Sequence, residues 1–380
     1  MTHSPSPLPA LSAPAAGSQT ASSPVQAQPA AQTVHQQFVN WLRQVAPSIH
    51  KFRGQTFVVG IPGEMLLVEN ALNALIHDLS LLHSIGIRVV IVNGCRPQIN
   101  AQLRLRGQAS HYHDGLRITD AVALECAKEA AGEIRYDMEA AFSQGLANTP
   151  MANAGIRVVS GNFTLARPVG IVDGVDFAYS GLVRKVDAAS IRHALDNQQI
   201  VLLSNIGYSA TGEAFNLAME DVAAITAMAL NADKLVFLAE VPGVRGEDGQ
   251  IQTEISEAQA RAVLAQPDLE LPLRIYLTAA LKACEGGVAR SHVVPFAVDG
   301  SVLLEFFLHD GVGTMVVRET LEAVREATIE DVSGILALIQ PLEADGTLVK
   351  RDRALIEAEI GNFTVIEHDQ VIFGCAAMYA

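Results

Sequence analysis

The sequence predicts an α/β protein with a parallel sheet sandwiched by helices, followed by the first half of a small α+β domain. Continuous apolar runs such as residues 88–93 alternate with amphipathic helical patterns, which is typical of parallel strands buried on both faces. Hydrophobic residues make up 49% of the 380 residues, enough for a large core. The pattern changes near residues 321–325, and residues 328–331 then read as a helix start.

The N-terminal region has two parts. Residues 1–33 contain no Asp, Glu, Lys or Arg and show no periodic apolar face, so we expect a disordered tail. From Val34 apolar residues recur at spacings of three and four, which predicts a helix that Pro47 ends. We favour packing of this helix on its own domain. The alternative is docking on a neighbouring subunit, because Phe38 and Trp41 are large for a terminal segment.

Strands and helices alternate through the middle of the chain. Apolar runs predict strands at residues 56–59, 88–93, 156–160, 200–204 and 235–239. Amphipathic patterns predict helices at residues 67–85, 118–141 and 221–232. After residue 328 we expect a helix that Pro341 kinks or shortens, a second helix at 353–360, and strands at 363–367 and 371–379. Two strands make a marginal sheet, so we expect a domain that is cut short.

Charge and composition exclude several classes. The formal net charge of −15 disfavours nonspecific binding to nucleic acid. No stretch reaches the ~20 apolar residues of a membrane helix. The four cysteines form no CxxC pair, so neither a disulfide framework nor a zinc site is expected. These features fit a cytoplasmic protein.

Three motifs carry a family resemblance. The runs Phe57-Val-Val-Gly-Ile-Pro-Gly-Glu64, Ile91-Val-Asn-Gly-Cys-Arg-Pro-Gln-Ile-Asn100 and Gly115-Leu-Arg-Ile-Thr-Asp120 resemble the amino-acid kinase family, and acetylglutamate kinase and its non-kinase relatives most closely. The part from about Val324 resembles the opening of a GNAT acetyltransferase domain. Together they resemble the bacterial-type N-acetylglutamate synthases. This implies a tail (1–33), an arginine-sensing, kinase-inactive domain (34–321) and the N-terminal part of a GNAT domain (322–380).

The resemblance implies an amino-acid N-acetyltransferase that converts acetyl-CoA and L-glutamate to N-acetyl-L-glutamate. This is the first step of arginine biosynthesis, controlled by L-arginine. The amine attacks the thioester directly, acetyl-CoA is a co-substrate and no prosthetic group is expected. The general base is unknown, and we expect it and the acetyl-CoA loop beyond Ala380, so this chain is expected to be inactive. A homo-oligomer, possibly a hexamer, is expected to form through the kinase-like domain and the N-terminal helix. The alternatives are a non-catalytic arginine-binding module and, less favoured, an acetylglutamate kinase.

Departures from the kinase pattern predict that phosphoryl transfer is lost. Kinases need a lysine and bare backbone N–H groups around the phosphates, but this chain has Gly60 at the lysine position and Cys95 and Arg96 in the glycine loop. Arg117 and Asn216 resemble contacts to the acyl amino acid, and we expect them to be vestigial.

Two further groups of residues resemble ligand contacts. The allosteric arginine site is expected at His292, Glu305, Gly311, Gly313 and Thr314, where a carboxylate can pair with a guanidinium. The alternative is an ordinary strand and turn with Glu305 as a solvated edge residue. Glutamate is expected at Arg325, Lys350 and Arg351, since a dicarboxylate needs cations, and the alternative there is a solvated helix start.

A histidine pair raises the question of a metal. His111 and His113 alternate on one predicted strand face and precede Asp114. No further ligand lies nearby in the sequence, so we expect no metal site.

Overall fold

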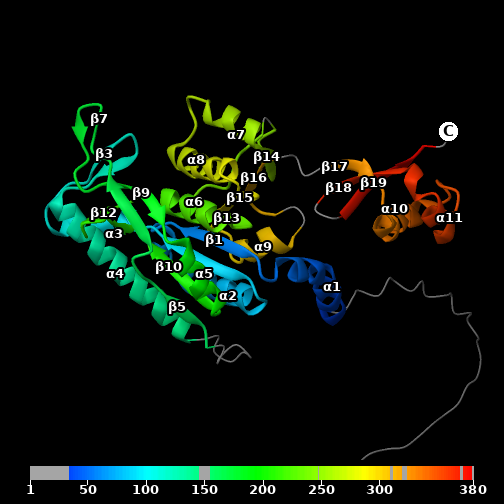
Figure 1. Cartoon of the computed structure of the whole chain (residues 1–380), viewed down its shortest axis with the longest axis horizontal. Helices are drawn as coiled ribbons and strands as arrows, with labels where there is room; N and C mark the ends of the chain where they lie inside the picture. The colour runs from blue at the N-terminus through cyan, green and yellow to red at the C-terminus, as the bar shows by residue number, and fades with distance from the viewer. Residues whose placement is uncertain are drawn as a thin grey trace, which may run out of the picture. The chain divides into compact units, whose positions relative to one another are not determined.

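The computed structural model describes residues 34–144, 155–246, 248–308, 311–318, 323–368 and 371–378 (Figure 1). The predicted tail at 1–33, the predicted limit at 321/322 and the end of the last strand at Tyr379 lie outside these residues. The chain divides into two compact units, residues 1–44 and 45–380. The domain limits inferred from the sequence therefore stay predictions.

The first helix, α1 (Val34–Phe52), runs through Pro47, so the prediction that Pro47 ends it is wrong. A proline inside a helix removes one hydrogen bond. Burial at the C-terminal end of α1 offsets that loss, because Val45 and Phe52 are almost completely buried and the Phe52 ring lies edge-on to Phe57 at 5.6 Å. Phe38, earlier in α1, is 59% exposed. How the early part of α1 packs stays a prediction.

An eight-stranded sheet is the centre of the second unit. Its order is β14-β16-β15-β13-β1-β2-β10-β5, and every neighbouring pair is parallel except β15–β16. The bounds are β1 Thr56–Ile61, β2 Arg88–Asn93, β5 Arg157–Val159, β10 Gln199–Ser204, β13 Lys234–Ala239, β14 Glu254–Ser256, β15 Arg290–Pro295 and β16 Thr314–Val317. The predicted parallel sheet is confirmed, with one antiparallel pair that the sequence did not indicate.

Helices cover both faces of this sheet, as predicted (Figure 1). Successive residues of β1 enter different cores: Val58 packs with side chains of α6 and α8, whereas Phe57 and Val59 pack with side chains of α2 and α4. The helices are α2 Ala71–Ser84, α3 Arg96–Leu105, α4 Ala121–Gln144, α5 Ala188–Asp196, α6 Met219–Leu230, α7 Glu257–Leu264, α8 Leu271–Glu285 and α9 Ser301–Phe307.

Two helices begin later than predicted. The predicted start of α2 at residue 67 is wrong, because residues 65–67 form a separate 3-10 turn and Asn70 has a left-handed backbone. The predicted start of α4 at residue 118 is also wrong, because residues 116–118 form a strand. In both cases the apolar period continues through a segment whose backbone is not helical.

Most of the shorter strands were not predicted. A second sheet has the order β12-β11-β6-β9, with bounds β12 Ala214–Asn216, β11 Ile206–Tyr208, β6 Thr164–Pro168 and β9 Gly181–Val186. Two hairpins accompany it, β3 (His111–His113) with β4 (Leu116–Ile118), and β7 (Ile171–Val172) with β8 (Val175–Asp176). Both turn on an Asp-Gly pair with positive φ at each residue, the preferred chemistry of a two-residue hairpin.

Residues 323–378 form their own antiparallel sheet, in the order β17-β18-β19, and their own core around Ile335 and Val365. The elements are β17 Ala323–Glu326, a 3-10 turn Ile329–Asp331, α10 Val332–Ala344, α11 Arg353–Ala358, a 3-10 turn Ile360–Asn362, β18 Phe363–His368 and β19 Val371–Ala377. The sequence predicted the last two strands but not β17. Pro341 lies inside α10, which continues to Ala344.

None of the described helices combines the length and the apolar character that a membrane span requires.

Candidate functional site

A pocket of about 390 Å³ opens where β1 and β2 end. In parallel sheets the carboxyl ends of the strands are the usual place for a ligand. The lining includes Gly63, Glu64, Gly94, Cys95, Arg96, Arg117, Asn205, Asn216, Glu220, Asp221 and Lys282. The structure thus brings the predicted residues Arg117 and Asn216 to one pocket, together with the side chains that depart from the kinase pattern.

Cations in this pocket are engaged by carboxylates. Arg96 lies 3.7 Å from Glu220, and Lys282 lies 2.5 Å from Asp221. Such pairs neutralise positive charge that would otherwise attract a phosphate. The Cys95 side chain is buried and its thiol donates to Asn205 at 3.0 Å, and burial raises the pKa of this thiol to about 12. On this side of the pocket both cations are therefore paired with carboxylates, and the Cys95 thiol is buried.

Arg117 is 6% exposed and is held by neutral acceptors. Its Nη2 donates to Asn100 at 2.7 Å and to the Tyr112 hydroxyl at 2.5 Å. Its Nη1 has no partner among the described residues. Burial lowers the pKa of this guanidinium. Arg117 thus carries a buried charge whose hydrogen-bonding capacity is only partly used.

Asn216 belongs to a buried polar chain rather than standing free in the pocket. Its Oδ1 accepts from Asn205 at 2.7 Å and its Nδ2 donates to Thr119 at 3.0 Å. Ser180 continues the chain, because its hydroxyl donates to the backbone oxygen of Arg117. The chain fixes the backbone that carries Arg117. These contacts give Asn216 a structural role in the wall of the pocket.

The predicted arginine-site residues come together at a second place. His292 lies on β15, and its Nδ1 is 2.7 Å from Oε1 of Glu305. Glu305 lies on α9 and its side chain is 4% exposed, so the alternative of a solvated strand residue is wrong. Its Oε2 accepts from the backbone N–H groups of Val312 and Gly313, at 2.8 and 3.0 Å. Glu305 therefore holds the turn that leads into β16.

Close packing explains the small residues in this turn. A Cβ on Gly313 would lie 2.2 Å from the backbone oxygen of Val293, and Gly311 has a φ of +60° beside the Glu305 carboxylate. Thr314 accepts from the backbone N–H of Val244 at 2.8 Å. Gly313 and Thr314 are thus required by the packing of the turn against β15 and the neighbouring loop.

Sequence reasoning missed a third polar residue at this place. Lys234, the first residue of β13, is 5% exposed, and its Nζ lies 3.3 Å from Nε2 of His292. The same ammonium lies 5.3–5.9 Å from the ring centroids of Phe52, Phe57 and Phe306. A lysine at the start of a continuous apolar strand was the only signal in the sequence.

The pKa values at this place reflect burial and neighbouring charges. Burial, and then the Lys234 charge, lower the pKa of His292 to about 4, so the imidazole is neutral at pH 7. Burial on its own raises the pKa of Glu305, but the hydrogen bonds from His292 and from the turn outweigh it and lower the pKa overall. The buried group is therefore an ionised carboxylate, a neutral imidazole and an ammonium.

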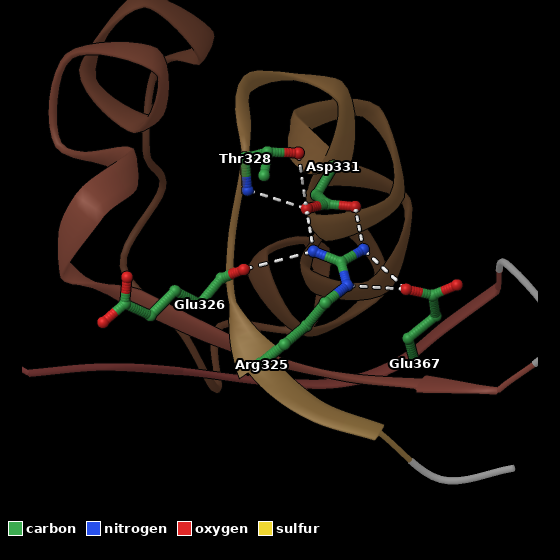
Figure 2. A network of polar contacts seen from close by, with 5 residues as sticks. All are labelled: Arg325, Glu326, Thr328, Asp331 and Glu367. Atoms are coloured by element: carbon green, nitrogen blue, oxygen red, sulfur yellow. Dashed lines mark hydrogen bonds and ion pairs between the residues drawn. The ribbon is translucent and has the colours of Figure 1, made fainter.

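Arg325, predicted to bind glutamate, is instead the centre of an internal network (Figure 2). Its Nη1 and Nη2 donate to the two oxygens of Asp331, at 2.7 and 2.8 Å. Its Nε and Nη2 contact Oε2 of Glu367 at 2.7 and 2.6 Å, and Nη1 also donates to the backbone oxygen of Glu326 at 3.1 Å. All five N–H groups of the guanidinium have an acceptor.

This network also caps a helix start. Oδ2 of Asp331 accepts from the backbone N–H and the hydroxyl of Thr328 (Figure 2), and the Arg325 hydrogen bond is the main reason that the pKa of Asp331 lies well below its usual range. Arg325 thus joins β17 to the start of α10 and to β18. Direct binding of a substrate carboxylate would require part of this network to break.

Lys350 and Arg351 precede α11. Lys350 is exposed, and the Arg351 guanidinium lies 5.9 Å from the Phe363 ring centroid. The backbone N–H of Arg351 donates to Glu343 at 2.7 Å. The structure therefore places this basic pair at the end of a loop tied to α10, and the glutamate-binding role of both residues stays a prediction.

The histidine on β3 has a neighbour that the sequence did not indicate. Ligand atoms of His113, Asp114 and Asp173 lie within 4.8 Å of one another, because the β3–β4 and β7–β8 turns meet. Asp-Gly turn chemistry accounts for both aspartates without a metal. The expectation of no metal site stays a prediction.

Comparisons with known proteins cover most of the chain. The amino acid kinase family matches residues 55–295. An amino-acid acetyltransferase from Ralstonia nicotianae is 59% identical over 344 residues, 90% of this chain and 76% of that protein. An amino-acid acetyltransferase from Pseudomonas fluorescens is 49% identical over 90% of this chain and 79% of that protein.

Solved structures of known proteins also resemble this chain. The N-acetylglutamate synthase of Neisseria gonorrhoeae, in complex with coenzyme A and L-arginine, has a TM-score of 0.81 and 38% identity over 90% of this chain and 78% of that chain. A Giardia carbamate kinase, 17% identical with a TM-score of 0.53 over 70% of this chain and 99% of that chain, supports the fold alone.

Proposed function

The chain belongs to the amino acid kinase family and to the amino-acid acetyltransferases, and on that premise we propose that it transfers the acetyl group of acetyl-CoA to the amine of L-glutamate. The observation that carries this proposal is the likeness to the N-acetylglutamate synthase of Neisseria gonorrhoeae over 90% of this chain. We further propose a cytoplasmic homo-oligomer, regulated by L-arginine through the kinase-like part.

The chemistry needs few protein groups. A neutral amine attacks the thioester carbonyl, the C–N bond forms and the C–S bond breaks. The attacking nitrogen loses one proton, and coenzyme A leaves as the protonated thiol. Cations must hold the two carboxylates of glutamate while this happens. Lys350 and Arg351 are the proposed contacts. Arg325 is not among the proposed contacts, because all five of its N–H groups already donate to Asp331, Glu367 and the backbone of Glu326.

A thiol-release assay tests the acetyltransferase. When the protein is mixed with acetyl-CoA and L-glutamate, the amount of coenzyme A released should equal the amount of N-acetylglutamate formed. Arg351→Ala should raise KM for glutamate roughly tenfold or more with little change in KM for acetyl-CoA. Arg353→Ala is the matched control, because Arg353 lies two residues later, as the first residue of α11, and pairs with Glu357 in an exposed position. Glutamate-independent thiol release would contradict the proposal.

Arginine binding is tested separately, by thermal melting. A ligand that binds only the folded state stabilises it in proportion to RT ln(1 + [L]/Kd). Millimolar L-arginine should raise the melting temperature by a few degrees, and L-lysine by much less, because an ammonium cannot make a bidentate pair with a carboxylate. The proposed contacts are Glu305, His292 and the turn from Gly311 to Thr314. Equal shifts with both amino acids would contradict an arginine site.

Kinase activity should be absent. Arg96 and Lys282 are paired with carboxylates, and the loop after β2 carries side chains where phosphates need backbone N–H groups. ADP release from Mg-ATP with acetylglutamate should stay at background. Turnover near ~1 s⁻¹ or above, within the range of kinases, would show that the pocket still transfers phosphoryl groups.

A further inference from the structure

A second cavity, of about 350 Å³, lies where β15 ends, between the start of α2 and the turn that leads into α9. Its lining comes from two segments, residues 65–78 and 296–302. His292, Glu305 and the turn from Gly311 to Thr314 do not belong to the lining. The volume is at the lower end of the range of small-molecule sites, which is about 300–1,000 Å³.

The charges in this cavity all have one sign. The charged lining residues are Glu69, Asp78 and Asp299, and none of the lining residues is a lysine, an arginine or a histidine. Asp78 is half-buried, and no hydrogen bond or ion pair within the described part of the chain engages its carboxylate. Burial, and then the charge of Asp299, raise the pKa of Asp78 to about 6. A positive charge in the cavity would relieve both causes.

A buried hydroxyl lines the same cavity. Ser301, the first residue of α9, is 5% exposed. Its backbone N–H donates to Val298 at 3.2 Å, but its hydroxyl has no hydrogen-bond partner among the described residues. Buried hydroxyls nearly always have a partner. Ser301 therefore indicates a polar group that comes from outside the chain.

The rest of the lining decides what kind of cation fits. The apolar side chains are Met65, Val68, Leu75, Phe296, Val298 and Val302. Hard metal ions prefer a shell of six or more oxygen ligands, and hydrocarbon walls do not supply it. An organic cation places its charge at the carboxylates and its hydrocarbon part on these walls. A carboxylate on the same ligand would be repelled by three negative charges.

We propose that this cavity binds a small organic cation, a protonated amine with a short apolar chain and no carboxylate of its own. An ammonium group has three N–H donors, and the cavity offers an acceptor for each, the carboxylates of Asp78 and Asp299 and the hydroxyl of Ser301. The site depends neither on the proposed acetyltransferase activity nor on the proposed arginine regulation.

The first test is calorimetric titration of the whole chain with butylamine at pH 8, where this amine is protonated like a lysine side chain. We expect saturable binding, and none with butanol, which has the same apolar chain without the charge. Calcium and magnesium chloride at equal ionic strength test the alternative of a metal ion. No saturable binding of butylamine, equal binding of butanol, or tighter binding of either metal ion would overturn the proposal.

The second test measures the proton that binding displaces. At pH 6 about half of the Asp78 side chains carry a proton, and the amine selects the ionised form. Titrations in two buffers of different ionisation enthalpy should therefore show release of roughly half a proton per bound amine at pH 6 and almost none at pH 8. Binding without proton release at pH 6 would contradict contact with Asp78.

The third test uses variants of the two aspartates. Asp78→Asn and Asp299→Asn should each weaken butylamine binding at pH 8 by roughly tenfold or more, because each removes a charge-assisted hydrogen bond. The ligand-free melting temperature should not fall in either variant, since the side chain that is lost had an unfavourable charge. Asp137→Asn, on the exposed face of α4, is the matched control and should bind as wild type does. Wild-type affinity in both cavity variants would overturn the site.

Arginine separates this cavity from the neighbouring contacts on α9. Asp78→Asn should show the same arginine-induced shift in melting temperature as wild type, because Asp78 is not among the proposed arginine contacts. A shift that is lost in this variant would mean that the two places form one site, which would overturn a separate amine site. If wild type shows no shift with arginine but binds butylamine, the arginine proposal fails and this one stands.

Discussion

Two hydrogen-bonded networks in this protein hold carboxylates in place, one partly exposed to water around Arg325 and one buried around Glu305. Around Arg325, a guanidinium that is 35% exposed uses all five donors on two carboxylates and a carbonyl. Around Glu305, a side chain that is 4% exposed holds one neutral imidazole and two backbone N–H groups, with an ammonium one step away. The first network can exchange partners with water, and the second cannot.

The difference predicts where charge changes matter most. In water-exposed networks salt and solvent screen each pair, so the loss of one partner is tolerated. In a buried network the loss of one partner leaves another charge without compensation. The following three experiments compare the two networks directly, from the largest expected effect to the smallest.

Glu305→Ala should have the largest effect. It removes the acceptor of His292 and of two turn N–H groups. Breaking a buried pair in this way costs about 3–5 kcal/mol, which in a chain of this size lowers the melting temperature by roughly five degrees. Thermal melts without arginine measure it. A loss below two degrees would mean that the network is not a stabilising unit.

Lowering the pH should act on the same buried network. The folded-state pKa of His292 is lowered to about 4 from an unfolded value of 6.5, so its contribution is complete above pH 6.5 and is lost as the pH falls toward 4. A difference of this size corresponds to roughly 3 kcal/mol. Urea unfolding at pH 7 and pH 4 measures the change in the free energy of unfolding.

His292→Asn is the control for this pH effect, because an amide can still donate to Glu305 but does not titrate. Its loss of stability between pH 7 and pH 4 should be smaller than that of wild type by about the same amount, roughly 3 kcal/mol. Equal losses in the two proteins would assign the acid sensitivity to other groups.

Arg325→Gln should have the smallest effect and a different signature. The melting temperature should fall by less than in Glu305→Ala, and the difference from wild type should shrink in 1 M NaCl, where the Debye length is only about 3 Å. The effect of Glu305→Ala should not depend on salt. If both effects respond alike to salt, the contrast between an exposed and a buried network is wrong.

Most strands of the main sheet could be predicted from the sequence. Strands such as 88–93 could be predicted because a strand buried on both faces is apolar throughout. The continuation of α1 past Pro47 could not be predicted. The hydrogen bond lost at this proline is offset by the burial of Phe52, which contacts residues elsewhere in the chain. The β17 strand was missed because four residues with one exposed apolar side chain, Val324, show no clear alternation.

The candidate sites were predicted in residue type but not in contact. His292 and Glu305 were grouped by resemblance, and the structure supplies the hydrogen bond between them. Lys234 was missed because 58 residues separate it from His292, and only the parallel pairing of β13 with β15 makes them neighbours. Arg325 was taken for a ligand contact because a single sequence does not reveal that Asp331 and Glu367 converge on it.

The strand order also has a consequence for synthesis of the chain. β1 pairs with β13, and Thr56 exchanges hydrogen bonds with Asp233, 177 residues later in the chain. While a ribosome makes the intervening segment, at about 5–20 residues per second, β1 and β2 can pair but the outer edge of β1 has no neighbour. For roughly 10–30 seconds the nascent protein therefore exposes an apolar strand edge, the kind of surface that chaperones cover and that neighbouring nascent chains can join.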